Sequence, residues 1–297
     1  MEDQYLEVRN LRKEAKKTIE GKADVVTAQI MRVGGSAGGA QAKALVDYNP
    51  DNQKIKSGFS EVTEGFIPCM IKFDGVRDGV EENCYGRLEY IYCEMARKCN
   101  ITVPKTYILE ENGRAHFLME RFDRTISKEK KFHYVSLSGI LKKDYIQKHS
   151  CTYEEYFQVT QFLTQDISQV VEAFKLAVFN IIFRNQDDHT KNFGFLMNKK
   201  GQWKVSPAFD LNYVYDFGNA KTHQMKLNEK DDDFEAKDFI ESGKKVGLKE
   251  AQIKNIIKTT MAVSDEFINL GLECGLEKNF LEGIKHRFRK INIQALQ

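Results

Sequence analysis

Short apolar blocks separated by turn residues fill the first 120 residues of the chain, a pattern typical of β-strands. The blocks predict five strands, at residues 25–33, 44–48, 66–73, 103–110 and 115–120. Asn112-Gly113 separates the last two blocks and is a strong signal for a short hairpin turn. Between the third and fourth blocks, apolar residues recur at helical spacing over residues 80–99, which predicts a helix.

The second half of the chain shows mainly helical periodicity. Residues 167–183 carry a broad apolar face that suits a buried helix. A polar cluster at residues 184–192 follows, and then a small hairpin with strands at 193–197 and 202–205. Helical patterns resume near residue 235 and fill the C-terminus.

We therefore predict an α+β protein with two lobes. The first lobe, residues 1–121, holds a mixed β-sheet, and the second lobe, residues 122–297, is mainly helical. The boundary is expected near residues 121–124, where the predicted hairpin ends.

The charge balance narrows the classes of function. Lys and Arg number 45 and Asp and Glu number 43, so the formal net charge is only +2. This balance argues against a broad electrostatic contact with nucleic acid or anionic lipid, and we expect no direct nucleic-acid binding. The sequence contains no apolar run long enough for a membrane span, and the six cysteines are scattered without metal-ligand spacing. With no secretory signal at the polar N-terminus, we expect a cytoplasmic protein, with export by a signal-independent route as the alternative.

The polar cluster after the buried helix contains a spacing that fits phosphoryl transfer. Four residues separate Asp187 from Asn192. Phosphoryl transfer needs a carboxylate to accept the proton of the attacking hydroxyl and an amide oxygen nearby to hold Mg²⁺. Asp210, directly after the small hairpin, is the expected carboxylate ligand of the metal. Asp216 opens an Asp-Phe-Gly triplet like that of protein kinases, but it lies farther beyond the hairpin, so we favour Asp210.

Lys72 lies among apolar residues in the third predicted strand and is the candidate cation for phosphate groups. A lysine in such a setting needs an anion, because burying an unpaired charge is costly. Glu89 on the following helix is the expected partner, with Glu94 as the alternative.

Four glycines fall within residues 34–39, between two predicted strands and upstream of Lys72. Glycine lets backbone N–H groups approach phosphate oxygens closely, so this position favours a loop that covers phosphates. The stretch matches neither the P-loop motif nor the strand-glycine-helix order of dinucleotide-binding folds. A flexible turn is the alternative interpretation.

Six segments, in order over about residues 33–215, resemble the HipA family of bacterial serine/threonine kinases, the toxin components of toxin–antitoxin pairs. The segments are Ser36-Ala37-Gly38-Gly39-Ala40-Gln41-Ala42-Lys43, Ile71-Lys72, Glu89, Glu120-Arg121-Phe122-Asp123-Arg124, Asp187-Asp188-His189-Thr190-Lys191-Asn192 and Phe209-Asp210-Leu211. Family members usually have proline where this chain has Ala42, a departure that does not touch the chemistry. The resemblance implies a two-lobed, protein-kinase-like fold.

The resemblance further implies an ATP-dependent serine/threonine protein kinase that uses Mg²⁺. It assigns Asp187 as the catalytic base and Asn192 and Asp210 as magnesium ligands. Ser36 corresponds to the loop serine that family members autophosphorylate, and a phosphate there would repel the phosphates of ATP and inhibit the enzyme. The residues implied to bind ATP are Gly38, Gly39, Ala40, Gln41, Lys43, Lys72, Glu120, Arg121, Phe122, His189 and Lys191.

The resemblance also implies partners. Family members phosphorylate aminoacyl-tRNA synthetases, so it implies a protein substrate of this class and an antitoxin, although nothing in the sequence selects one synthetase. Long HipA proteins carry an additional N-terminal subdomain before the glycine loop, whereas 35 residues precede Ser36 here. We therefore expect a short form of a toxin-like regulator, with that subdomain absent or encoded as a separate chain.

Other classes of function stay open as alternatives. Asp187, His189 and Asn192 are also similar to the catalytic loop of phosphoinositide kinases, which makes a lipid kinase the alternative enzyme, beside a secreted effector kinase. A pseudokinase acting as a binding module is the non-enzymatic alternative. Against it, the chain keeps Lys72, Asp187, Asn192 and Asp210, at least one of which a pseudokinase commonly lacks. A DNA-binding repressor is disfavoured by the charge balance and by the lack of a recognisable recognition-helix module.

Overall fold

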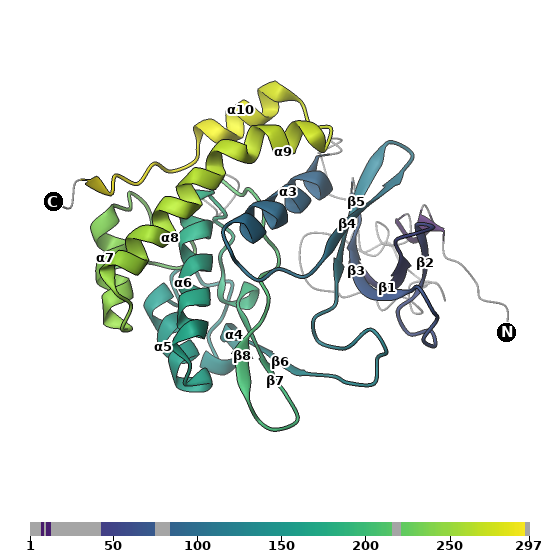
Figure 1. The fold of residues 1–297 in the computed structure, drawn as a ribbon, viewed down its shortest axis with the longest axis horizontal. Helices are drawn as coiled ribbons and strands as arrows, with labels where there is room; N and C mark the ends of the chain where they lie inside the picture. Colours follow the sequence, from purple (N-terminus) through teal and green to yellow (C-terminus); the bar gives the residue numbers. More distant parts are fainter. Residues whose placement is uncertain (1–6, 9, 13–42, 75–83, 216–220, 295–297) are drawn as a thin grey trace. The chain divides into compact units, whose positions relative to one another are not determined.

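The computed structural model describes residues 7–8, 10–12, 43–74, 84–215 and 221–294 (Figure 1). The chain divides into two compact units, the first comprising Met1–Tyr90 and Pro104–Lys131 and the second Ile91–Val103 and Phe132–Gln297. Helix α3 (Tyr85–Lys98) begins in the first unit and ends in the second. The lobe boundary predicted near residue 121 stays a prediction.

The first unit contains a five-stranded antiparallel sheet with the strand order β2-β1-β3-β5-β4. Its core consists of apolar side chains from neighbouring strands, including Val46, Ile71 and Leu118, none of which is exposed to solvent. The strands are β1 (Lys43–Asn49), β2 (Lys54–Ser57), β3 (Ile67–Lys72), β4 (Thr106–Glu111) and β5 (Arg114–Glu120).

Strands β4 and β5 form the hairpin that the sequence predicts. Asn112 and Gly113 have φ angles of 50° and 75°, so both adopt the left-handed conformation that a two-residue type I′ turn requires. The strands predicted at residues 44–48, 66–73, 103–110 and 115–120 are confirmed, with ends that shift by a few residues. The strand predicted at residues 25–33 lies outside the described residues, as does most of the glycine-rich stretch.

The second unit is mainly helical and adds a three-stranded antiparallel sheet in the order β6-β7-β8. The strands are β6 (His133–Ser136), β7 (Gly194–Met197) and β8 (Trp203–Val205). The helices are α4 (Leu137–Leu141), α5 (Tyr153–Thr164), α6 (Ile167–Ile182), α7 (Ala236–Lys245), α8 (Glu250–Val263), α9 (Phe267–Glu273) and α10 (Lys278–His286), with 3₁₀ turns at Thr190–Asn192 and Ser264–Glu266.

Helix α6 is the central element of this unit and confirms the helix predicted at residues 167–183. It packs against α5 and α8, and its apolar face is buried along its length. The helix begins where the Asp166 side chain accepts a hydrogen bond from Ser168 N, a standard N-cap. It ends before Arg184, whose φ of 57° turns the chain out of the helix and into the polar cluster. The polar cluster therefore directly follows a buried, well-packed helix, which fixes the position where it begins.

The sequence pattern missed four elements: β2, β6, α4 and α5. Strand β2 is only four residues long and reads Lys-Ile-Lys-Ser, so it offers little apolar signal. Helix α5 is held by a capping box, in which Thr152 accepts from Glu155 N while Glu155 accepts from Thr152 N. That local signal, together with buried Tyr156 and Phe157, was available in the sequence.

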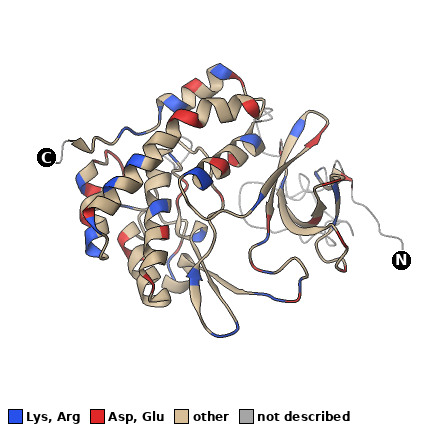
Figure 2. Ribbon diagram, in the orientation of Figure 1, with Lys and Arg blue, Asp and Glu red and all other residues tan. Residues whose placement is uncertain are grey.

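Acidic and basic residues alternate along the helices of the second unit, as the colours of the ribbon in Figure 2 show. This distribution agrees with the small net charge of +2. Among the described residues, no helix is both long enough and apolar enough to cross a membrane.

Candidate active site

Lys72 and Glu89 form a buried ion pair in the first unit. Lys72 is the last residue of β3, and its Nζ lies 2.6 Å from Glu89 Oε1 on α3. The two side chains are only 5% and 2% exposed, and pairing offsets part of the cost of burying their charges. Glu94, the alternative partner, instead contacts Arg97 on its own helix.

A close approach between α3 and β5 brings Glu89 to the sheet. A Cβ atom on Gly86 would lie 2.0 Å from the carbonyl oxygen of Ala115, so only glycine permits the first turn of α3 to pack so near β5. Lys72 lies opposite Phe117 of β5 in the strand register, with its Nζ 5.8 Å from the ring centre. On the other side, Lys43 of β1 lies opposite Lys72. Two lysines thus share one face of the sheet, and Glu89 is paired with one of them.

The chain that leaves β3 is held by a buried histidine. Asp74 N donates a hydrogen bond to His116 Nδ1 at 3.0 Å, so the neutral ring carries its proton on Nε2. Burial lowers the pKa of His116 to about 4, although the Glu111 carboxylate opposes this shift. The neutral imidazole therefore fixes the backbone two residues after Lys72.

This arrangement makes the first unit sensitive to acid. The pKa of His116 is about 4 in the folded protein and about 6.5 in an unfolded chain. Between these two values the unfolded state binds a proton on this side chain and the folded state does not, so acid favours unfolding. We expect the free energy of unfolding to fall by up to about 3 kcal/mol between pH 6.5 and 4, measured by urea denaturation across this range. His116→Asn keeps an acceptor for Asp74 N and should flatten that part of the profile; an unchanged profile would contradict the assignment.

Glu120, Arg121 and Phe122, which the resemblance implies to bind ATP, form the last residue of β5 and the two residues after it, and are called the hinge below. Glu120 N donates to Lys105 O at 2.9 Å and Arg121 N donates to Pro68 O at 2.8 Å. Tyr107 Oη donates to the Glu120 carboxylate at 2.6 Å. A shallow cavity of about 490 Å³ lies beside this segment, lined in part by Ile67, Pro68, Glu120 and Arg121. The N–H groups of Glu120 and Arg121 are both bonded within the protein, so neither is the expected donor to a base.

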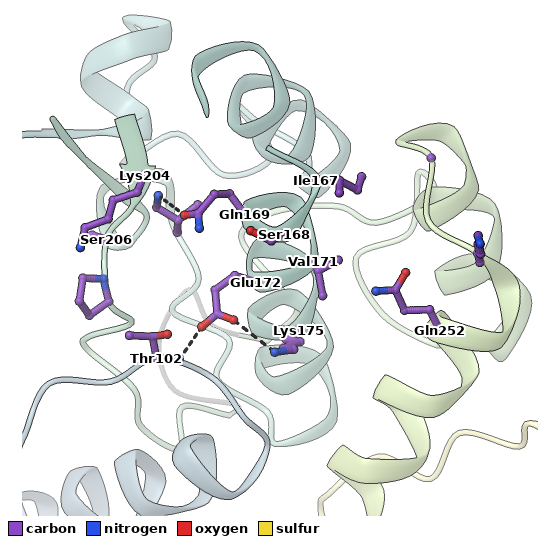
Figure 3. A pocket seen from close by; sticks show the side chains of 14 residues that line it. Thr102, Ile167, Ser168, Gln169, Val171, Glu172, Lys175, Lys204, Ser206 and Gln252 are labelled. Atoms are coloured by element: carbon purple, nitrogen blue, oxygen red, sulfur yellow. Dashed lines mark hydrogen bonds and ion pairs between the residues drawn. The ribbon is translucent and has the colours of Figure 1, made fainter. Parts of the chain in front are cut away.

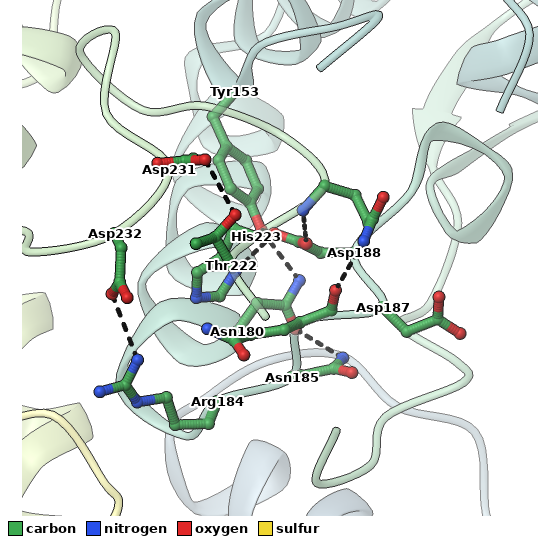
Figure 4. A network of polar contacts seen from close by, with 12 residues as sticks. Tyr153, Asn180, Arg184, Asn185, Asp187, Asp188, Thr222, His223, Asp231 and Asp232 are labelled. Atoms are coloured by element: carbon green, nitrogen blue, oxygen red, sulfur yellow. Dashed lines mark hydrogen bonds and ion pairs between the residues drawn. The ribbon is translucent and has the colours of Figure 1, made fainter. Parts of the chain in front are cut away.

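Two adjacent carboxylates have opposite surroundings in the polar cluster of the second unit. The side chain of Asp187 is 56% exposed, whereas that of Asp188 is completely buried. Figure 4 shows the Asp187 carboxylate pointing away from the polar network that surrounds Asp188. The structure therefore leaves Asp187 accessible for chemistry and uses Asp188 as an anchor.

Asp188 receives hydrogen bonds from two distant segments. Tyr153 Oη donates to Oδ2 at 2.6 Å, Gln224 N donates to Oδ1 at 2.7 Å, and His223 Nδ1 lies 2.8 Å from Oδ2. Burial and the Asp188 charge hold the pKa of Tyr153 well above its usual value, so its hydroxyl remains a donor. Asn180 of α6 extends the network, since its Nδ2 lies 3.4 Å from Tyr153 Oη. The anchor thus joins α5, α6 and the segment after Asp210 to one carboxylate.

The remaining residues of the loop surround Asp187. Asn192 Nδ2 donates to Asp187 O at 3.0 Å, which leaves its Oδ1 as an acceptor. His189 Nε2 lies 3.9 Å from Asp187 Oδ1, and the ring of His189 packs against Tyr145. Lys191 Nζ lies 4.7 Å from the centre of the same tyrosine ring. The structure therefore brings Asp187, His189, Lys191 and Asn192 together, as the sequence motif predicts.

Asp210 follows β8 in a left-handed conformation, with φ of 57°. Burial, and secondly the charge of Asp210, raise the pKa of Tyr134 on β6 to about 12. Phe209 packs edge-on against the same tyrosine. Asp216, the alternative metal ligand, lies outside the described residues.

The donor chemistry of this unit fits a magnesium ion. Carboxylate and amide oxygens are the ligands that Mg²⁺ prefers, and it usually keeps water and phosphate oxygens in the rest of its shell. The described residues contain no group of three or more His, Cys, Asp or Glu side chains that could hold a metal alone. Asn192 and Asp210 are the residues that would hold the ion, with water or phosphate oxygens in the rest of its shell.

Five of the buried polar atoms that have no hydrogen-bond partner among the described residues lie in the same loop. They are Asn185 Oδ1, Gln186 Nε2 and Oε1, His189 Nδ1 and Thr190 Oγ1. Buried polar groups are nearly always satisfied in native proteins, so these atoms indicate bound water or a ligand at the loop.

Sequence reasoning missed the residues that build the loop's anchor: Tyr153, Asp188 and His223. Asp188 was visible as part of the motif, but nothing in its spacing distinguished a buried anchor from a reactive carboxylate. Of the predicted nucleotide-binding residues, Lys43, Lys72 and the hinge lie in the first unit, and His189 and Lys191 lie in the second. Ser36, Gly38, Gly39, Ala40 and Gln41 lie outside the described residues.

Comparison with known proteins identifies the family of the chain and two relatives named as kinases. A family model described as the HipA-like C-terminal domain matches residues 35–267. A putative kinase of Haemophilus influenzae is 24% identical over 200 residues, which cover 57% of each chain. The putative kinase Y4mE of Sinorhizobium fredii is 22% identical over 184 residues, covering 59% of this chain and 41% of the relative. This chain therefore spans about half the length of these curated relatives.

Two solved structures share the fold. HipA of Shewanella oneidensis, in a complex of the toxin–antitoxin system with HipB and operator DNA, superposes with a TM-score of 0.66 at 18% identity, covering 95% of this chain and 69% of that one. The proinflammatory kinase CtkA of Helicobacter pylori superposes with a TM-score of 0.51 at 14% identity, covering 86% and 90%. At these identities the likeness concerns the fold alone, and it confirms the predicted kinase-like α+β fold.

Proposed function

The chain belongs to the family of HipA-like C-terminal domains, and on this premise we propose that it is an ATP-dependent kinase of serine or threonine side chains in proteins. The observation that carries the proposal is the loop at residues 187–192. It holds an exposed carboxylate, Asp187, on a buried anchor, Asp188, with the Asn192 amide bonded to the Asp187 carbonyl. Phosphoryl transfer needs this combination of a base and a nearby amide oxygen.

In the proposed reaction, Asp187 accepts the proton of the attacking hydroxyl. The hydroxyl oxygen forms a bond to the γ-phosphorus of ATP, while the bond from that phosphorus to the bridging oxygen breaks and ADP leaves. Asn192 and Asp210 are the proposed ligands of Mg²⁺, which when bound neutralises charge on the phosphates. Because Asp188 accepts bonds from Gln224 N and Tyr153, it fixes the backbone from which Asp187 extends.

In the first unit, Lys72 is the proposed contact for the nucleotide phosphates, with Glu89 holding its ammonium group at 2.6 Å. The presence of Lys43 opposite Lys72 supports an anionic ligand on this face. The proposed hinge, Glu120–Phe122, would read adenine through its other backbone groups, since the N–H groups of Glu120 and Arg121 are already bonded within the protein. Gly38, Gly39, Ala40 and Gln41 complete the proposed nucleotide site.

The proposal extends to regulation and partners. We propose that Ser36 is autophosphorylated and that the added charge inhibits ATP binding. HipA of Shewanella oneidensis, which shares the fold of this chain, is in a complex with HipB, and this supports the proposal of an antitoxin partner. We further propose a toxin-like role in the bacterial cytoplasm with an aminoacyl-tRNA synthetase as substrate class. An exported effector kinase stays the alternative.

Incubation with γ-labelled ATP and Mg²⁺ tests the proposal. Wild-type protein should label itself or an added protein, and Asp187→Ala should lower the rate by at least about 100-fold, the usual contribution of a general base. Equal labelling of the wild type and Asp187→Ala would show that Asp187 is not the general base. Absence of label in both would favour a pseudokinase, and label recovered in lipid would favour a lipid kinase.

A further inference from the structure

An open trough crosses the outer face of helix α6 in the second unit (Figure 3). Its volume is about 800 Å³. The floor is a helical stripe at spacings of three and four residues, formed by Ser168, Val171, Glu172 and Lys175. Strand β8 and the following residues border one side, and the N-terminal part of α8 borders the other, with Gln252 pointing back toward α6.

The charges that line the trough do not balance. Its described lining includes three lysines, Lys175, Lys204 and Lys249, and one acid, Glu172. The Glu172 carboxylate is already satisfied on the floor, because it accepts hydrogen bonds from Thr102 N and from Lys175 Nζ. Lys204 and Lys249 are both exposed: Lys204 is on the β8 side, where its Nζ lies 6.0 Å from the ring centre of Phe132, and Lys249 precedes α8 on the other side. The trough therefore presents two positive charges across a neutralised floor.

Apolar surface lies between these charges. Ile167, at the start of α6, is 51% exposed, although it is a large aliphatic side chain. Val171 lies one turn farther along the same helix and is partly exposed. The floor from Ser168 to Lys175 spans about 10 Å of helix, enough for about three residues of an extended chain. A short segment could thus cover the apolar surface while its charges reach both walls.

We propose that this trough docks a short segment of a partner protein that carries acidic residues on either side of an apolar one. Charge complementarity to Lys204 and Lys249 selects the acidic residues, and the exposed Ile167–Val171 surface selects the apolar one. The described residues that line the site all belong to the second unit, and none of them is assigned to phosphoryl transfer. The trough is thus a docking surface separate from the catalytic loop.

Selection from a library of random short peptides displayed on phage tests the proposal without ATP, so it is independent of kinase activity. Peptides selected on the wild-type protein should be enriched in Asp and Glu around an apolar residue. Synthetic copies of the selected peptides should bind Lys204→Glu/Lys249→Glu at least about tenfold more weakly, about 1.4 kcal/mol, and their affinity for the wild type should fall with added salt. Ile167→Ala should weaken binding several-fold.

The matched control is Lys200→Glu/Lys258→Glu, which makes the same change in net charge at exposed positions outside the trough. This control should leave the peptide affinity within about twofold of the wild type. Peptides without acidic residues, failure to select any peptide, or equal loss in both double variants would overturn the proposal. A wild-type dimer in sedimentation that Ile167→Ala disperses would instead assign the trough to a second copy of the chain.

Discussion

Replacement of Asp188 by alanine should lower the free energy of unfolding by about 3–5 kcal/mol. The substitution removes a completely buried carboxylate that accepts hydrogen bonds from Tyr153 Oη and Gln224 N and lies 2.8 Å from His223 Nδ1. All of these groups would lose their shared acceptor in the interior of the second unit. Urea denaturation followed by far-UV circular dichroism measures the change.

The neighbouring residue supplies the control. Asp187→Ala changes the same type of side chain one position earlier, but at a carboxylate that is 56% exposed, so its effect on stability should stay within about 0.5 kcal/mol. Tyr153→Phe removes one of the donors and should cost about 1–2 kcal/mol. Similar losses of stability for Asp187→Ala and Asp188→Ala would show that the buried network does not anchor the loop.

Asp187 is exposed and Asp188 is buried because of the residues around them, and the sequence does not reveal these surroundings. Adjacent aspartates look equivalent in a motif. The partners that make Asp188 an anchor are Tyr153 and Gln224, which lie 35 and 36 residues away along the chain. Spacing rules find residues that share a loop or a helix face, whereas contacts between distant segments emerge only once the chain has folded.

The elements that the sequence predicted well are those with a strong local pattern. Helix α6 has a continuous apolar face, and the β4–β5 hairpin has an Asn-Gly pair that suits its turn, so both were found at nearly their observed positions. Strand β2 carries two lysines in four residues and is stabilised by pairing with β1, which is a tertiary effect. The partner of Lys72 was predicted because a charge among apolar residues demands an opposite charge, a physical requirement that the sequence alone expresses.

Breaking the buried ion pair between Lys72 and Glu89 should have the other large effect on stability. Lys72→Met should lower the free energy of unfolding by about 3–5 kcal/mol, because it removes the ammonium group 2.6 Å from a carboxylate that is only 2% exposed. Glu89→Leu should be similarly destabilising from the other side. An exposed pair supplies the contrast: Lys278 and Glu282 lie 3.7 Å apart at 68% and 55% exposure, so Lys278→Met should cost less than about 1 kcal/mol.

The double variant Lys72→Met/Glu89→Leu separates stability from function. Replacing both buried charges by apolar side chains of similar size removes the desolvation cost, so its free energy of unfolding should return to within about 1 kcal/mol of the wild type. The proposed contact with the nucleotide phosphates would nevertheless be gone, and transfer of label from ATP should stay lost in this stable protein. Recovery of both stability and transfer would show that the pair serves only the fold. If stability recovers and transfer of label does not, the ion pair does not add to the stability of the fold. Its role would then be to place the ammonium group of Lys72 for binding the nucleotide.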